Sequence, residues 1–94
     1  MNSGTKEIKK LLKNYCLYRA SISNMEKSVS LKQKLDALDN AVNAMDEESK
    51  KIVELVFYKR QSVEDAAYAM GYARSTMFYR VNGILAHLSY VTGI

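Results

Sequence analysis

Three features of this sequence predict an all-α fold. Proline is absent and only 4 of the 94 residues are glycine, so few positions interrupt a helix. Apolar residues recur at alternating spacings of three and four, and no stretch shows the strict alternation of a half-buried strand. The predicted architecture is a helical hairpin over residues 1–45, followed by a three-helix domain over residues 46–94.

The predicted hairpin rests on two apolar seams. The first lies on a single helix over residues 5–28, widened by Leu12, and consists of Ile8, Leu11, Tyr15, Tyr18, Ile22, Met25 and Val29. Ser30 and Gln33 form a capping-box pattern, so a second helix is predicted to begin at Leu31. Its seam continues with Leu35, Leu38, Val42 and Met45. The first seam has two possible partners: the second helix of the same chain, or a second copy of the chain in a coiled-coil homodimer.

A capping residue also marks the start of the third helix. Asp46 is a favourable N-cap, and Glu47 and Glu48 suit the positive end of the helix that follows. This helix ends near residue 58 and is apolar over much of its surface, so we expect it in the core. Its apolar residues are Ile52, Val53, Leu55, Val56 and Phe57.

The last two helices are joined by a turn that contains glycine. Ser62, with Asp65 three residues later, predicts the start of a short helix over residues 63–70. Gly71 supplies the positive φ that ends this helix. A final helix is predicted over residues 73–90, and its core-facing side carries Met77, Val81, Ile84 and Leu88.

A short helix, a glycine turn and a second helix form the plan of a helix-turn-helix motif. The outward side of the final helix is polar, and no acidic residue follows Asp65. Such a face suits the major groove of DNA, although a solvated helix surface without acids is the simpler alternative. The candidate base readers are Ser75, Thr76 and Tyr79, with Asn82 on the same face and Phe78 on its flank. The candidate phosphate contacts are Lys59, Arg60, Arg74 and Arg80.

The distribution of charge fits a polyanionic partner. The formal net charge is +4, and residues 1–34 carry eight Lys or Arg against two acids. Residues 35–54 instead carry six acids against two lysines. A basic N-terminal third and a final helix without acids would attract an anion such as nucleic acid. A charge that only keeps the protein in solution explains the same distribution.

The sequence offers no constellation typical of catalysis or metal binding. The only cysteine, Cys16, lies beside the first seam and is predicted to act as a small apolar residue. With His87 as the only histidine, a Cys–His zinc site cannot be assembled. Asp36 and Asp39 share a helix face and are predicted to be surface charge. We therefore expect no enzyme and no cofactor. Without a signal-peptide or membrane-spanning pattern, the expected location is the cytoplasm, away from membranes.

The second half of the chain resembles region four of bacterial sigma factors. The residues that carry this resemblance are MDEESKKIVELVFYKRQSVEDAAYAMGYARSTMFYRVNGIL. They are most similar to small phage regulators of late transcription, of the ArpU and RinA type. The family pattern is an acidic N-cap, an apolar helix and then S-x-E-x-A-x-x-x-G-Y-S-x-x-T-x-Y-R.

The resemblance implies binding to double-stranded DNA and a phage or prophage setting. The leading hypothesis is a sequence-specific, late-gene transcription activator whose N-terminal hairpin serves self-association or contact with bacterial RNA polymerase. Two other functions stay open. One is a helical adaptor that binds RNA polymerase or a sigma factor without touching DNA. The other is a small terminase-like subunit that recognises a packaging site.

One departure from the family pattern concerns the cap of the final helix. The family has Ser or Thr where this chain has Ala73, and loss of such a cap typically costs ~1 kcal/mol. Ser75 cannot replace the cap in the same register. We expect packing of Tyr72 to hold the first turn instead.

Overall fold

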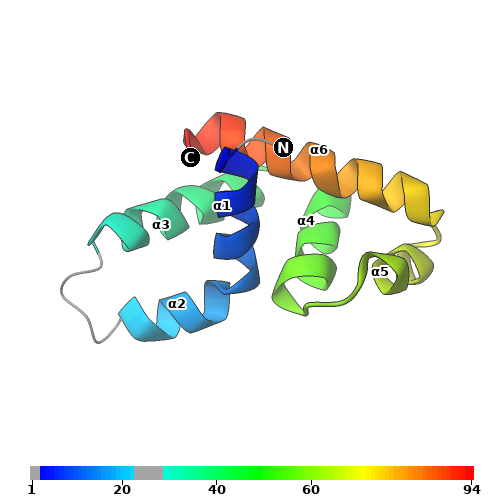
Figure 1. The fold of residues 1–94 in the computed structure, drawn as a ribbon, viewed down its shortest axis with the longest axis horizontal. Coiled ribbons are helices and arrows are strands. Elements are labelled where there is room, and N and C mark those ends of the chain that lie inside the picture. The colour runs from blue at the N-terminus through cyan, green and yellow to red at the C-terminus, as the bar shows by residue number, and fades with distance from the viewer. Residues whose placement is uncertain (1–2, 23–28) are drawn as a thin grey trace.

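The computed structural model describes residues 3–22 and 29–94, which form six α-helices and one π-helical turn, with no strand in these ranges (Figure 1). The elements in chain order are α1 (Ser3–Lys13), α2 (Tyr15–Ile22), α3 (Val29–Asn43), α4 (Glu47–Val53), the π turn η1 (Glu54–Tyr58), α5 (Val63–Met70) and α6 (Arg74–Thr92). The predicted all-α class is confirmed.

Four of the other helices pack against α6. This 19-residue helix contacts α1, α3, α4 and α5. In Figure 1, α1 and α4 both run away from α6 at steep angles, and α5 lies below its N-terminal half. The buried side of α6 consists of Met77, Val81, Ile84, Leu85 and Leu88. Buried side chains from residues 1–45 and from residues 46–94 belong to one hydrophobic cluster.

The sequence predicted that the first apolar seam lies on one continuous helix, and this prediction is wrong. The helix is interrupted at Asn14, and Figure 1 shows α2 leaving α1 at a steep angle. The Lys10 carbonyl accepts two hydrogen bonds from Asn14, one from its side-chain amide at 3.0 Å and one from its backbone N–H at 3.1 Å. The bend keeps Ile8 and Leu12 fully buried against the core. Residues 23–28, with Met25 of the predicted seam, lie outside the described residues.

Several residues of the first seam pack against other parts of the same chain. Ile8 and Leu11 are buried, so this part of the seam offers no surface to a second copy. The second helix begins at Val29 instead of Leu31, which places Ser30 in its first turn and not at its cap. Its predicted seam does face the core through Leu35, Leu38 and Val42, which are buried.

An ionic cluster joins α2 to α3. The Arg19 guanidinium pairs with Asp36 at 2.9 Å and also with Asp39. The Tyr15 hydroxyl donates to Asp39 at 2.7 Å, and its ring lies 5.3 Å from that of Tyr58. Burial, together with the nearby charge of Asp39, raises the pKa of Tyr58 to about 12. Asp36 and Asp39 are charges on the surface, as the sequence predicted, and both pair with Arg19, which lies far from them along the chain.

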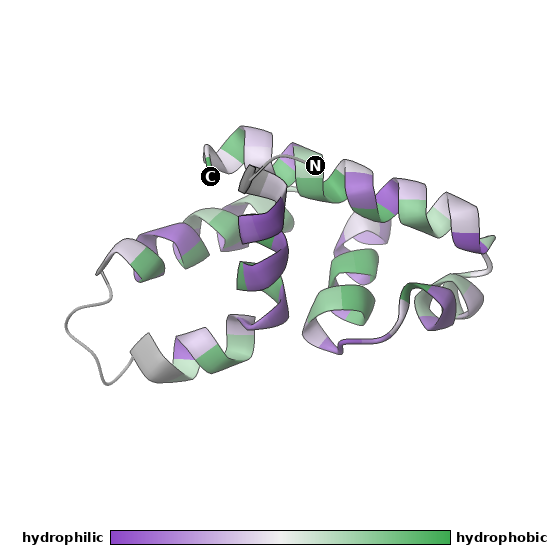
Figure 2. Cartoon of the chain, in the orientation of Figure 1, coloured by the Kyte–Doolittle hydropathy of each residue, from purple (hydrophilic) through white to green (hydrophobic). Residues whose placement is uncertain are grey.

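The helix that begins at Asp46 changes from α to π before it ends. The Asp46 carboxylate caps it by accepting a hydrogen bond from the Ser49 backbone at 2.7 Å, and this bond lowers the pKa of Asp46. Further on, the Lys59 N–H bonds to the Glu54 carbonyl five residues back, the spacing of a π-helix. The turn buries three consecutive side chains, Leu55, Val56 and Phe57. Figure 2 shows this segment as largely hydrophobic, whereas the side of α1 facing the viewer is hydrophilic.

Replacement of Phe57 should destabilise the whole fold. Its side chain is fully buried at the centre of the cluster, so Phe57→Ala is expected to lower the free energy of unfolding by ~3–5 kcal/mol. Urea denaturation followed by circular dichroism measures this loss. Tyr90→Ala is the control because Tyr90 is 87% exposed, and its effect should stay within about 0.5 kcal/mol. Equal losses in the two variants would contradict the placement of Phe57.

Candidate nucleic-acid interface

α5 is capped at both ends and is joined to α6 by a short turn. The Ser62 hydroxyl accepts a hydrogen bond from the Asp65 backbone at 3.0 Å and so caps α5, as predicted. Gly71 ends α5 with φ +73°, and the Tyr72 N–H then bonds back to the Ala67 carbonyl at 2.8 Å. A Cβ on Gly71 would meet no atom within 4 Å, so backbone conformation and not crowding favours glycine here.

Small side chains let α5 approach α6 closely. Ala66 and Ala67 are buried in the shared cluster, together with Met77 from the first turns of α6. Met70 and Val63 pack against the edge of this cluster. The two helices are therefore held in a fixed relation by a short turn and a common core.

The first turn of α6 has no side-chain cap. Ala73 occupies the N-cap position with an extended backbone and no side-chain hydrogen bond, as its sequence implied. Tyr72 packs against the core, and the Arg80 guanidinium lies 4.8 Å from the centre of its ring. A hydrogen bond to Glu48 raises the pKa of the Tyr72 hydroxyl. Packing and polar contacts of Tyr72 thus fix the chain immediately before this helix begins.

The N-terminal half of α6 presents a polar face to solvent. Ser75, Thr76, Tyr79 and Asn82 are all exposed, and Tyr79 reaches 81% exposure. None of their side chains forms a hydrogen bond or ion pair within the described ranges. Four groups able to donate or accept hydrogen bonds are therefore exposed, with no side-chain hydrogen bond to another residue of the described ranges.

The arginines that flank this face have carboxylate partners on preceding helices. Arg74 pairs with Glu64 of α5 at 3.1 Å, and Arg80 pairs with Glu48 of α4 at 2.5 Å. Lys59 similarly pairs with Glu54 at 3.4 Å. All six side chains are between about one-third and two-thirds exposed, and pairs of this kind contribute about 0–1 kcal/mol.

These ion pairs were not visible in the sequence. Arg74 and Arg80 lie in a stretch of the sequence without acids, so no carboxylate close to them along the chain indicates a partner. Glu48 was expected to serve only the positive end of its own helix. Packing of α4 and α5 beside α6 brings Glu48 and Glu64 to the two arginines.

Phe78 and Arg60 complete the flank of α6. Phe78 is 42% exposed, and the Arg74 guanidinium lies 5.4 Å from its ring centre. Arg60 is exposed, has no ion pair within the described ranges and adopts φ +57°, where glycine is the usual residue. Its conformation ends the π turn, because it lets the next N–H, that of Gln61, bond to the Leu55 carbonyl at 2.9 Å.

The remaining sequence candidates form no second site. Cys16 is exposed, although the sequence suggested a small apolar residue, because the bend at Asn14 turns its helix away from the core. His87 is also exposed. Within residues 3–22 and 29–94, no group of three or more His, Cys, Asp or Glu could hold a metal ion. No helix in these ranges is long and apolar enough to cross a membrane.

Comparisons with known proteins assign no family to the chain. It matches no protein-family model, no curated protein and no solved structure.

The backbone of Arg60 provides a test of this site that is independent of any ligand. A left-handed conformation costs a non-glycine residue roughly 1–2 kcal/mol, so Arg60→Gly is expected to raise the free energy of unfolding by about 0.5–1 kcal/mol. Lys59→Gly is the neighbouring control. Lys59 has φ −86°, so glycine there should lower stability by about 0.5–1 kcal/mol. Chemical denaturation of both variants would reveal an error in this turn if the two effects had the same sign.

Proposed function

We propose that the chain is a sequence-specific, DNA-binding regulator of transcription whose α6 lies in the major groove. The observation that carries the proposal is the exposed, acid-free face at the N-terminal half of α6, with Tyr79 at 81% exposure. This face follows a short glycine turn from α5, the arrangement in which a helix-turn-helix motif presents its recognition helix.

The residue types on this face suit base recognition. The major groove of B-form DNA accepts an α-helix, and each base pair there displays a distinct pattern of donors and acceptors. Ser75, Thr76 and Tyr79 lie near the N-terminal end of α6, the part of a recognition helix that contacts base edges. Asn82, one turn further, can form the paired hydrogen bonds that an amide makes with adenine.

The flanking cations suit the phosphates on either side of the groove. Arg74 and Arg80 each have a surface carboxylate partner, which a phosphate can replace at little net cost because the pairs are exposed. Lys59 and Arg60 lie between the π turn and α5 and would add two further phosphate contacts. Contacts of this kind fix the orientation of a protein on the duplex without reading its sequence.

The biological setting is part of the same proposal. The similarity of the second half of the chain to sigma region four, and to phage late-transcription regulators of the ArpU and RinA type, supports a phage or prophage late-gene activator. Bacterial RNA polymerase is the expected protein partner. A homodimer on two half-sites would have to use a surface other than Ile8 and Leu11, which are buried within the chain.

Substitution of a base reader and substitution of a phosphate contact should have different effects on DNA binding. Tyr79→Ala and Thr76→Ala are expected to narrow the gap between specific and non-specific binding by ~1–3 kcal/mol. Arg60→Ala and Arg80→Ala should weaken both kinds of binding and reduce the salt slope by about one unit each. Fluorescence anisotropy measures these effects with a sequence selected from a random DNA pool and an unrelated duplex, each at two salt concentrations.

Two results would contradict the proposal. Absence of salt-dependent binding of the wild type to either duplex would favour the adaptor that binds polymerase or a sigma factor without DNA. If the wild type binds DNA and none of the four substitutions changes this binding, α6 is not part of the interface.

The carboxylate partner of Arg80 should restrain DNA binding. Glu48→Gln retains an acceptor for the Tyr72 hydroxyl but removes the charge that holds Arg80. The variant is therefore expected to bind both duplexes up to about fivefold more tightly, the equivalent of one exposed ion pair. Glu47→Gln is the matched control, since Glu47 pairs only with Lys50 in the described residues. The same gain in both variants would show a general charge effect and not release of Arg80.

A further inference from the structure

A groove lies between α1, the end of the π turn and α6. It encloses about 280 Å³, and its floor includes the buried side chains of Val56, Phe57 and Leu85. Phe78 and Asn82 of α6 form one wall. The groove therefore opens beside the exposed face of α6, with which it shares Asn82, and Phe78 on the flank of that face also lines it.

Three cations line the groove: Lys9 and Lys13 of α1, and Arg60. Lys9 and Lys13 are one helical turn apart and so lie on the same side of α1. No Asp or Glu lines the groove, and none of the three cations has an ion pair within the described ranges. They differ in this respect from Arg74 and Arg80, which are paired with carboxylates.

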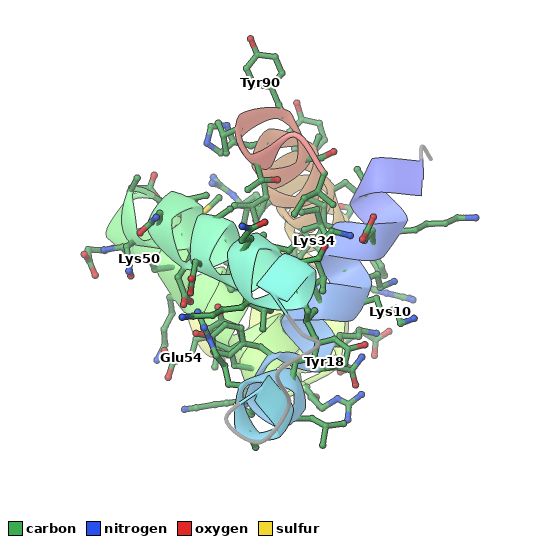
Figure 3. The ribbon with its side chains drawn as sticks, turned by 90° about the vertical axis from the view of Figure 1, so that its left-hand side faces the viewer. Lys10, Tyr18, Lys34, Lys50, Glu54 and Tyr90 are labelled. Carbon is green, nitrogen blue, oxygen red and sulfur yellow. The ribbon has the colours of Figure 1, made fainter. Side chains whose placement is uncertain are left out.

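The carboxylates of the π turn and of α3 and α4 do not line the groove. In Figure 3, Lys10 of α1 and Glu54 of the π turn lie on opposite sides of the molecule. The acids of α3 and α4 are largely engaged with cations of their own, such as Asp36 with Arg19 and Glu47 with Lys50. An anion that approaches the groove meets three cations and no carboxylate in the lining, and of the two acids that follow the lining residue Val63, Glu64 is paired with Arg74.

We propose that this groove holds one phosphodiester strand of the DNA whose major groove receives α6. Lys9, Lys13 and Arg60 would contact successive phosphates, and the partly exposed ring of Phe78 would pack against deoxyribose. The inference rests on the proposed function and extends it, because it makes α1 part of the DNA interface. Arg60, whose backbone is in the left-handed conformation, is one of the cations at the groove, so the inference proposes a role for this unusual residue.

An acidic amphipathic peptide would match the same combination of cations and apolar floor. DNA is favoured because Asn82 belongs both to the groove and to the exposed face of α6. One continuous ligand can then occupy the groove and contact Tyr79 and Asn82 on the outward face. A peptide confined to the groove would leave that outward face without a partner.

The test compares two double variants of α1 in binding to a 30-base-pair duplex of random sequence. Lys9→Ala/Lys13→Ala removes two of the three cations that line the groove. Lys6→Ala/Lys10→Ala removes two lysines with the same spacing from the same helix, which line a different depression beside Glu7. Both variants lose the same net charge, and alanine favours the helix in each case.

The DNA affinity of the groove variant should depend less steeply on salt than that of the wild type, and the affinity of the control variant should keep the steeper dependence. The slope of log affinity against log salt is expected to become less steep by about two units in Lys9→Ala/Lys13→Ala, at about 0.9 per phosphate contact. Between 50 and 200 mM salt, the wild type should therefore lose about tenfold more affinity than this variant. Circular dichroism and thermal unfolding check that both variants remain folded.

The outcomes separate this inference from the proposed function. If the wild type binds DNA and Tyr79→Ala impairs specificity, but the groove variant behaves like the control, the groove does not hold DNA. The groove would then be left for an acidic protein segment, while the role of α6 stands. If the wild type does not bind duplex DNA, both proposals fail together.

Discussion

Burial of one side of α6 along most of its length holds the other helices in place. Four of them pack against the stripe that runs from Met77 to Leu88, so each reaches the common cluster by contact with the same helix. A stripe that is buried over many turns fixes the rotation of a helix about its axis. The outward direction of Tyr79 and Asn82 is thus a consequence of core packing and needs no additional contact.

The flanks of this helix show two kinds of cation. Arg74 and Arg80 are held by carboxylates and by the rings of Phe78 and Tyr72, so their guanidinium groups occupy defined positions before any ligand arrives. A phosphate would replace the carboxylate but leave the ring in place, so the ring contact limits the side-chain entropy that a phosphate contact would otherwise remove. Lys9 and Lys13 have no comparable restraint and contribute mainly through their charge.

Features encoded within a few residues were predictable from the sequence. The Asp46 and Ser62 caps depend on a backbone N–H three residues later, and the end of α5 depends on the conformation of Gly71 alone. The buried stripe of α6 follows from its apolar spacing. The residues proposed to read bases were likewise placed on the outer face correctly, because the side opposite a buried stripe is defined by the same helical repeat.

Features that depend on distant partners were not predictable. Nothing near Arg80 in the sequence indicates that Glu48 pairs with it, because packing of α4 against α6 creates that contact. The bend at Asn14 likewise divides a seam that has an unbroken heptad pattern. Leu55, Val56 and Phe57 signalled burial but not the π turn, since three consecutive apolar residues are also compatible with an ordinary buried helix.

The π turn also has a consequence for how this chain should be aligned with relatives. A hydrogen bond that spans five residues instead of four accommodates one more residue than the α-helix it continues. A homologue with a regular helix here would be one residue shorter between Ile52 and Ser62 and could still keep the same core. The alignment gap belongs within residues 54–58. If it were placed after the turn, Arg60 would be matched to the wrong position and its unusual conformation would be attributed to a neighbour.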